Sequence, residues 1–309
     1  MLSRIAESLF WIGRYIERSD GTARILDVHL QLLLEDQWVD EDTACRALIS
    51  VMGAVEASPE PITRSDVVAR LAVDRTEPAS IAFSVHSARD NARRAREIIS
   101  TELWECVNET YTRLPRKLSL EKTHEFFRWV RERTALAFGL VEGGISHDEA
   151  YQFMKLGQTI ERVDMTARLL ATSSLTEASG PSWTTILRSC GAYESYLRSY
   201  RGVPSKQNAA EFLILDRLFP RSIYTSISRA DIALRKIDPS SNRTGQMDEA
   251  QRLLGQVRSE LEFTPVSSII AELPEHMERI EAVVGAASEA IRQRYFPTIA
   301  LPVWIGEFS

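Results

Sequence analysis

Cysteine and long apolar runs are scarce in this chain, and each scarcity excludes a class of protein. The 3 cysteines among 309 residues are odd in number and widely spaced, at Cys45, Cys106 and Cys190. This spacing fits a reducing compartment and neither a disulfide framework nor a zinc site. No apolar run approaches the ~20 residues that a membrane helix needs, and Arg4 and Glu7 interrupt the start of the chain where a signal peptide would be apolar. We therefore expect a cytoplasmic protein with no membrane partner, in which the cysteines pack in the interior.

Positive charge is in deficit and lysine is rare. The formal net charge of −6 at pH 7 argues against a general nucleic-acid-binding protein, because such proteins are usually basic. A content of 44% hydrophobic and 26% charged residues is typical of a folded globular chain. Of the 37 basic residues 5 are lysine, which leaves 32 arginines. Arginine suits fixed ion pairs and the recognition of carboxylates or phosphates, because its planar guanidinium donates two parallel hydrogen bonds.

The most informative feature of the sequence is a segment that occurs twice. Residues 9–26 read LFWIGRYIERSDGTARIL, and residues 153–170 read FMKLGQTIERVDMTARLL, at an offset of 144 without a gap. The identities include glycine and charged residues, which a shared amphipathic pattern alone would not repeat. The identical pairs are Gly13/Gly157, Ile16/Ile160, Glu17/Glu161, Arg18/Arg162, Asp20/Asp164, Thr22/Thr166, Ala23/Ala167, Arg24/Arg168 and Leu26/Leu170.

Two further blocks recur in the same order. GAVEA at 53–57 matches GAYES at 191–195, and the pattern DRxxPxSI occurs at both 74–81 and 216–223. Three collinear matches predict an internal duplication of a unit of about 145 residues, with the copies related by a pseudo-twofold axis.

This interpretation sets the expected domain boundaries. The first copy covers 1–145 and the second covers 146–296, and each contains one Glu-Arg motif. The remaining residues, 297–309, form an apolar tail that we expect to dock on its own bundle. Binding of the tail to a partner is the alternative.

Helical periodicity runs through nearly every segment between prolines and glycines. The pattern Ser146-x-x-Glu149 predicts a capping box before the second motif. Single helices are predicted over 183–201 and over 267–295. We find no strand alternation and no βαβ rhythm. The predicted fold class is all-α, with two tandem helical bundles packed into one globular body.

The Glu-Arg dipeptides allow three interpretations. Gly13 and Glu17 are four residues apart and share a helix face, and a mid-helix glycine, which costs about 1 kcal/mol, suggests that another helix crosses closely there. Under a twofold axis, Glu17 faces Arg162 and Glu161 faces Arg18 as buried reciprocal ion pairs, the interpretation that we favour. Alternatively, Glu17 and Glu161 bind a cation or act as catalytic acid and base in a shared polar site. A solvated charged face is the third interpretation.

Other arginines and acids add candidates for ion pairs or ligand binding. An acid and an arginine spaced four apart follow each Glu-Arg dipeptide, as in a helical ion pair. In the arginine-rich stretch 89–96, three arginines fall on one predicted helix face, which could clamp an anionic ligand or an acidic partner. A solvated face that pairs with the acidic excess is the interpretation that we favour for this stretch. The full set of candidates is Arg18, Arg162, Asp20, Arg24, Asp164, Arg168, Arg89, Arg93 and Arg96.

Signatures of metals, cofactors and catalysis are missing. Glu121-x-x-His124 has the spacing found in di-iron helices, but such sites need a second copy of the motif, and Ser268 stands at the equivalent position. No Gly-rich phosphate loop, GxSxG motif or zinc spacing occurs. We therefore expect no metal and no cofactor.

Several segments resemble one known family. They are MLSRIAESLFWIGRYIERSDGTARIL, RDNARRAREIISTELWECVN, the second Glu-Arg helix, GAYESYLRSYRG and FLILDRLFPRSIYTSI. Through them the chain resembles the bacterial alpha-E domain family, an all-helical family named for its Glu-Arg motif. Ser19 and Gly21 depart from the family pattern, which loosens the helix slightly but leaves Glu17 and Arg18 in place.

The resemblance implies a biological context and no assigned reaction. Members are encoded beside, or fused to, a circularly permuted ATP-grasp amide ligase. A transglutaminase-like protease and sometimes a proteasome-like peptidase accompany them. The resemblance therefore implies a system that makes or processes peptide-like amide bonds.

Two functional hypotheses follow. In the first, which we favour, the chain is a non-catalytic helical subunit that docks the ATP-grasp ligase and helps to position an acidic peptide or amino-acid substrate. In the second, it is an enzyme in which Glu17 and Glu161 are the acid and base, while Arg18 and Arg162 orient a carboxylate substrate. The second needs both motifs to face one concave pocket. Whether the chain forms a homo-oligomer is left open.

Overall fold

The computed structural model describes residues 1–35, 40–54, 59–173, 182–239 and 248–297. All regular secondary structure in these ranges is helical, which confirms the all-α fold class. Two short elements differ from α-helices: η1 is π-helical and η2 is a 3₁₀-helix. The elements are α1 Ser3–Glu35, α2 Glu41–Val51, α3 Arg64–Val68, η1 Ala69–Val73, α4 Ile81–Arg94, α5 Thr101–Thr112, η2 Leu120–Lys122, α6 Thr123–Gly144, α7 Glu149–Ser173, α8 Trp183–Ser189, α9 Tyr193–Ser199, α10 Lys206–Leu215, α11 Ile223–Ile237, α12 Glu249–Phe263, α13 Val266–Ala271 and α14 Leu273–Tyr295.

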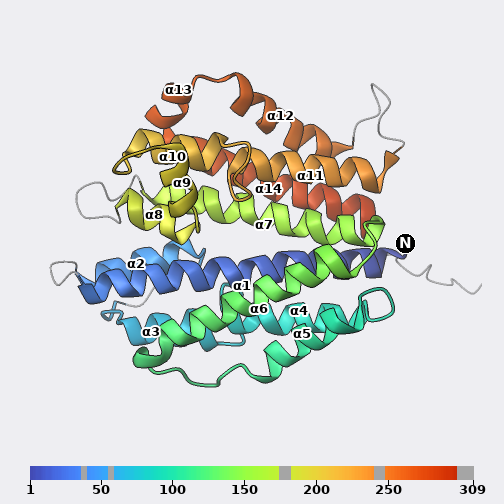
Figure 1. Cartoon of the computed structure of the whole chain (residues 1–309), viewed down its shortest axis with the longest axis horizontal. Helices are drawn as coiled ribbons and strands as arrows, with labels where there is room; N and C mark the ends of the chain where they lie inside the picture. The colour runs from blue at the N-terminus through green and yellow to red at the C-terminus, as the bar shows by residue number, and fades with distance from the viewer. Residues whose placement is uncertain (36–39, 55–58, 174–181, 240–247, 298–309) are drawn as a thin grey trace, which may run out of the picture.

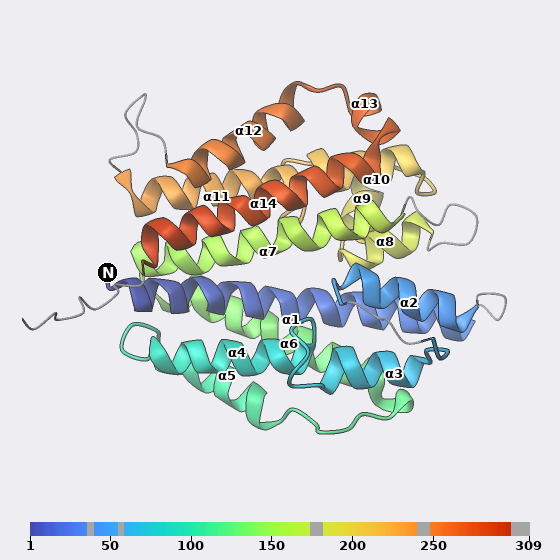
Figure 2. The same ribbon diagram turned by 180° about the vertical axis from the view of Figure 1, so that it is seen from behind.

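The two long helices that carry the repeated motif, α1 and α7, lie side by side in the middle of the molecule (Figures 1 and 2). They run in the same direction. The amino group of Met1 binds the carboxylate of Glu149 at 3.2 Å at one end, and Gly21 lies against the side chain of Met165 farther along. Each of the two helices is covered by its own set of neighbours.

Two four-helix bundles result from this arrangement. In the first, α1 packs on α4 and α6, and α5 closes the ring; in the second, α7 packs on α11 and α14, and α12 closes the ring. Figure 1 shows the first bundle below the central pair and the second above it. In addition, α2 contacts α7 and α8 contacts α1, so each half reaches across to the other's central helix. The chain forms one globular body, as predicted.

The repeated DRxxPxSI block builds the same turn in both halves. Ser80 and Ser222 cap α4 and α11, and each side chain accepts a hydrogen bond from the backbone N–H three residues on. Asp74 and Asp216 each accept from the backbone N–H two residues on, which closes the turn before the cap. The descent of the halves from one duplicated unit remains a prediction from the sequence.

The structure corrects two predicted helices. The segment 183–201 contains α8 and α9 and not one continuous helix, because Gly191 adopts a φ of +62°, which ends a right-handed helix. The segment 267–295 is likewise divided into α13 and α14. Pro274 lies in the first turn of α14, where its missing N–H costs nothing, whereas in the interior of one long helix it would break a hydrogen bond.

The start of α7 and the tail also differ from expectation. The side chain of Asp148, not Ser146, caps the helix: its Oδ1 accepts from the backbone N–H of Ala150 at 2.9 Å. A carboxylate next to the first turn also interacts favourably with the helix dipole. The predicted docking of the tail concerns residues 298–309, which lie outside the described residues.

Candidate functional site

The two central helices cross where their motifs carry glycine. A Cβ added to Gly13 would overlap the carbonyl oxygen of Met154 on α7, and one added to Gly157 would overlap the carbonyl oxygen of Phe10 on α1. Only hydrogen atoms fit between the two backbones at this level. The crossing therefore brings the next turn of each helix, which contains the Glu-Arg dipeptide, next to its counterpart.

Both reciprocal ion pairs are present at the crossing. Arg18 donates two hydrogen bonds to Glu161, from Nε to Oε1 at 2.5 Å and from Nη2 to Oε2 at 3.0 Å. Across the crossing, Nε of Arg162 lies 2.8 Å from Oε1 of Glu17. Glu17 and Glu161 are 2% and 1% exposed. These are buried charges with partners from the opposite helix, the arrangement in which loss of one partner is costly.

The environment of Glu161 does not favour acid–base chemistry. Burial acts to raise the pKa of this carboxyl, but Arg18 and Arg14 overcome that effect and lower the pKa to about 2. A general acid or base works best with a pKa near the operating pH. In addition, Glu161 and Glu17 line different cavities. The geometry therefore lends no support to a Glu17–Glu161 catalytic pair.

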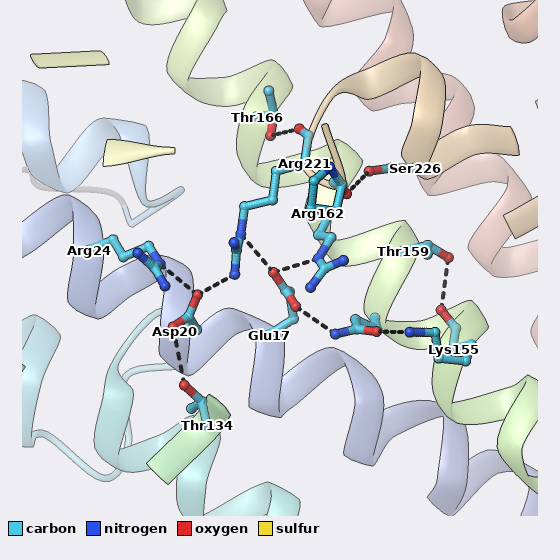
Figure 3. A network of polar contacts seen from close by, with 12 residues as sticks. Glu17, Asp20, Arg24, Thr134, Lys155, Thr159, Arg162, Thr166, Arg221 and Ser226 are labelled. Carbon is cyan, nitrogen blue, oxygen red and sulfur yellow. Dashed lines mark hydrogen bonds and ion pairs between the residues drawn. The ribbon is translucent and has the colours of Figure 1, made fainter. Parts of the chain in front are cut away.

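Around Glu17, a second arginine, in addition to Arg162, links α1 to the turn before α11 (Figure 3). Arg221, which immediately precedes the cap of α11, lies with Nε 3.3 Å from Oε1 of Glu17. Its Nη2 donates to Oδ2 of Asp20 at 2.6 Å. On the other side of Glu17, Nε2 of Gln158 donates to Oε2 at 3.1 Å. Arg221 thus bridges the two carboxylates that α1 presents.

Asp20 is a buried carboxylate with three hydrogen-bond donors around it. Besides Arg221, it accepts from Nε of Arg24 at 2.8 Å and from the hydroxyl of Thr134 on α6 at 3.1 Å. Burial acts to raise its pKa, but Arg221 and Arg24 hold the pKa of Asp20 below its usual value. Asp20 is therefore an ionised structural anchor that joins α1 to both bundles.

The second half repeats part of this arrangement. Arg168 donates to Asp164 at 3.1 and 3.3 Å, as Arg24 does to Asp20. Each of these two arginines ends against a glycine of the opposite half. Gly53 has a φ of +74° and lies against Arg168, and Gly191 lies in the same way against Arg24. The glycine that begins each repeated block therefore adopts a left-handed conformation and leaves space for a guanidinium.

Two differences between the halves change the arginines around the glutamates. Arg14 occupies on α1 the place that Gln158 has on α7, and its Nε donates to Oε2 of Glu161 at 2.7 Å. In the repeated turn, Ala79 stands where the other half has Arg221, at the offset of 142 that also relates Ser80 to Ser222. The first difference adds an arginine to the Glu161 side, and the second removes one from it.

A cavity of about 240 Å³ lies beside Ala79. The equivalent place beside Arg221 holds a cavity of only about 20 Å³. The larger cavity lies between α1, α7, the end of α2 and the turn that leads into α4. It is lined by Arg18, Ile25, Val51, Met52, Gly53, Glu77, Pro78, Ala79, Glu161, Asp164, Met165 and Arg168.

A pH-sensitive carboxyl lies beside this charged cluster. Burial raises the pKa of Glu281 on α14 to about 7; Arg168 opposes the rise, whereas Asp164 and Glu278 add to it. Between pH 4.5 and 7 the unfolded chain releases a proton that the folded chain retains, so the free energy of unfolding decreases as the pH rises through this window.

Replacement of Glu281 by glutamine should abolish this pH dependence. At each pH, the melting temperature of wild type is subtracted from that of Glu281→Gln. We expect this difference to be larger at pH 8 than at pH 5 by about 2 °C or more. Calorimetric melting at both pH values measures the difference. Glu275→Gln is the control, because Glu275 is exposed on the same helix and does not contribute to the raised pKa of Glu281. A difference for Glu281→Gln that stays constant with pH would contradict the assignment.

The arginine-rich stretch lies away from the crossing. Helix α4 ends at Arg94, so Arg96 lies beyond it, and the prediction of one helix face for Arg89, Arg93 and Arg96 is wrong. Arg89 and Arg96 instead meet at Trp104 on α5, with their guanidinium carbons 5.9 and 5.3 Å from the ring centre. Arg93 is exposed.

Residues that the sequence analysis overlooked complete the cluster: Arg14, Gln158, Arg221 and Glu281. A signal for one of them was available, because Arg221 and Ala79 occupy the same variable position of the repeated DRxxPxSI block. Within the described ranges, no group of three or more His, Cys, Asp or Glu residues is placed to hold a metal ion. In the same part of the chain, no helix has both the length and the apolar character needed to cross a bilayer.

Comparisons with known proteins agree with this architecture. Among curated proteins, the chain is similar to the uncharacterized proteins Mb2597 of Mycobacterium bovis and MT2643 and Rv2567 of Mycobacterium tuberculosis. In each case the identity is 26% over 97% of this chain and 38% of the relative, so the chain spans well under half the length of these proteins. No solved structure matches significantly. The family model of a predicted alpha-helical domain with a conserved ER motif matches residues 1–296, and the chain therefore belongs to the Alpha-E family.

Proposed function

We propose that the chain is a helical accessory subunit of a system that forms peptide or amide bonds. In this role it docks a circularly permuted ATP-grasp ligase and helps to position the acidic peptide or amino-acid substrate of that ligase. The resemblance to the alpha-E family supplies the identity of the partner. The division of the arginines into two groups supports the role.

The arginines of the motif are used within the chain. Arg18 and Arg162 face buried glutamates, while Arg24 and Arg168 bind the aspartates four residues before them. Arg18 and Arg162 thereby join the two central helices, whereas Arg24 and Arg168 are engaged within their own helices. An acidic partner or substrate would therefore need other arginines.

Arg89, Arg93, Arg94 and Arg96, together with Trp104, form what we call the arginine surface. Arg93, Arg94 and Arg96 are exposed, and Ile98 beside them is 43% exposed. Arginine and tryptophan are enriched among the residues that contribute most to protein–protein binding. The exposed guanidiniums at the end of α4 are the observation that carries the proposal, because they could bind carboxylates of a partner or of an acidic substrate.

The length of the relatives is consistent with such a role. In the three mycobacterial proteins, the region similar to this chain occupies 38% of a longer protein. A helical unit that is joined to further sequence in relatives is suited to work beside another module. A docking surface on the unit would serve the same purpose when the modules are separate chains.

Charge reversal on the arginine surface tests this function. The double variant Arg93→Glu, Arg96→Glu is expected to bind a circularly permuted ATP-grasp ligase from the same organism at least tenfold more weakly than wild type, because two attractive contacts become repulsive. Calorimetric titration measures the Kd, and product formation by the ligase is followed with and without the chain.

The matched control reverses two exposed arginines of the other bundle, Arg252 on α12 and Arg292 on α14. This control should bind the ligase like wild type. Two results would contradict the proposal: no binding of the wild-type chain to the ligase, or equal binding by both double variants.

A further inference from the structure

The cavity beside Ala79 lies where the other half of the molecule holds a guanidinium. Around Glu17, Arg221 enters from the turn before α11 and binds Glu17 and Asp20 together. Around Glu161, the equivalent turn carries Ala79, and the cavity of about 240 Å³ takes the place of the arginine side chain. The lining residues on α1, α2 and α7 are the counterparts, at the offsets of the three repeated blocks, of those that surround Arg221.

The carboxylates at this cavity retain the acceptor capacity that Arg221 uses in the other half. Oε1 of Glu161 accepts one hydrogen bond, from Arg18. Each oxygen of Asp164 also accepts one, from Arg168. A carboxylate oxygen can accept about two hydrogen bonds. Arg14 leaves these acceptor sites unused, because it donates to the other oxygen of Glu161, Oε2. The equivalent contact in the other half is the one from Gln158 to Oε2 of Glu17.

Charged groups of both signs line the cavity, and among the lining residues carboxylates outnumber guanidiniums. The lining carries the carboxylates of Glu77, Glu161 and Asp164 and the guanidiniums of Arg18 and Arg168. Glu77 is also paired with Arg70, outside the lining, at 2.9 Å. In the other half, the guanidinium of Arg221 lies between the carboxylates of Glu17 and Asp20. On the Glu161 side, Arg14 supplies a guanidinium from outside the lining and leaves the place between Glu161 and Asp164 unfilled.

We propose that this cavity binds the guanidinium group of a small ligand of about the size of arginine, between Glu161 and Asp164. Its volume is just below the roughly 300–1,000 Å³ typical of sites for drug-sized ligands. Pro78 and Gly53 are exposed, so the cavity reaches the surface between α2 and the turn before α4. Met52 and Met165 supply apolar contacts for the methylene groups of the ligand.

This inference is independent of docking to a ligase, because the test uses the chain by itself. Calorimetric titration with L-arginine should show one site, and L-citrulline should bind at least tenfold more weakly, since its urea group has the shape of guanidinium without the charge. N-acetyl-L-arginine amide shows whether the natural ligand is an arginine side chain of a peptide or the free amino acid. Tighter binding than that of L-arginine indicates a peptide, and weaker binding indicates the free amino acid.

Two variants complete the test. Ala79→Arg places the missing side chain in the cavity and should weaken L-arginine binding at least tenfold without lowering the melting temperature. Arg221→Ala opens the equivalent site, and if this variant folds, L-arginine should bind with a second equivalent and raise its melting temperature more than that of wild type. Absence of L-arginine binding to wild type, equal binding of L-citrulline, or unchanged binding by Ala79→Arg would each overturn the proposal.

Discussion

Gly13→Ala should destabilise the protein by about 3 kcal/mol, near the upper end of the cost of overpacking a core. The added methyl group would overlap the backbone carbonyl of Met154, and Gly157→Ala would overlap that of Phe10 in the same way. A backbone atom inside a helix cannot rotate away as the end of a flexible side chain can. The two central helices would therefore have to separate, which would also lengthen the ion pairs one turn further on.

Urea unfolding at pH 7 measures this effect, and Gly139→Ala provides the matched control. Gly139 is also a mid-helix glycine, in α6, but it is exposed and nothing lies within 4 Å of the place where its Cβ would be. There alanine should be neutral or should stabilise the protein by up to about 1 kcal/mol through its helix propensity. Equal effects at Gly13 and Gly139 would show that the close crossing is not what requires glycine.

Glu161→Gln should cost about 3 kcal/mol of unfolding free energy at pH 7, because it leaves two arginines without their counter-charge. Removal of one member of a buried ion pair typically costs 3–5 kcal/mol. The lower end applies here because the side chains of Arg14 and Arg18 are still 11% and 20% exposed. The amide can replace part of the hydrogen bonding but none of the charge.

The pH dependence separates loss of charge from loss of packing. The pKa of Glu161 is lowered from 4.5 to about 2, so its ion pairs contribute fully above pH 4.5 and are lost as the pH falls toward 2. Unfolding free energies of wild type and Glu161→Gln should therefore converge below pH 4.5. Glu249→Gln, which removes the exposed partner of Arg252, should change stability little at any pH. If Glu161→Gln has a lower free energy of unfolding than wild type by the same amount in acid as at pH 7, the variant has a packing defect.

The structural role of the repeated glycine–glutamate spacing could be predicted from the sequence. The repeat of glycine four residues before glutamate, at Gly13 and Gly157, predicts a close crossing on one helix face. The reciprocal pairing of Glu17 with Arg162 follows once a twofold arrangement is assumed. Both depend on local helix geometry and on symmetry, which a sequence displays directly.

The ends of helices and the positions of surface arginines were harder to predict from the sequence. The left-handed turn at Gly191 divides a segment that has continuous helical periodicity, and periodicity alone does not reveal a φ of +62°. Arg96 was assigned to the same helix as Arg89 for the same reason. Its position depends on where α4 ends and on the ring of Trp104, a residue of another helix.

The sequence by itself determined the all-α fold class and the reciprocal pairing of the two Glu-Arg motifs, because helical period and repeated residues are properties of the linear order. Only the tertiary structure decided that Arg221 reaches Glu17 and Asp20 from 201 residues or more away, and that Ala79 leaves a cavity at the equivalent place. Burial and the contents of a cavity depend on side chains brought together from several helices. That convergence is set by packing, which no single segment encodes.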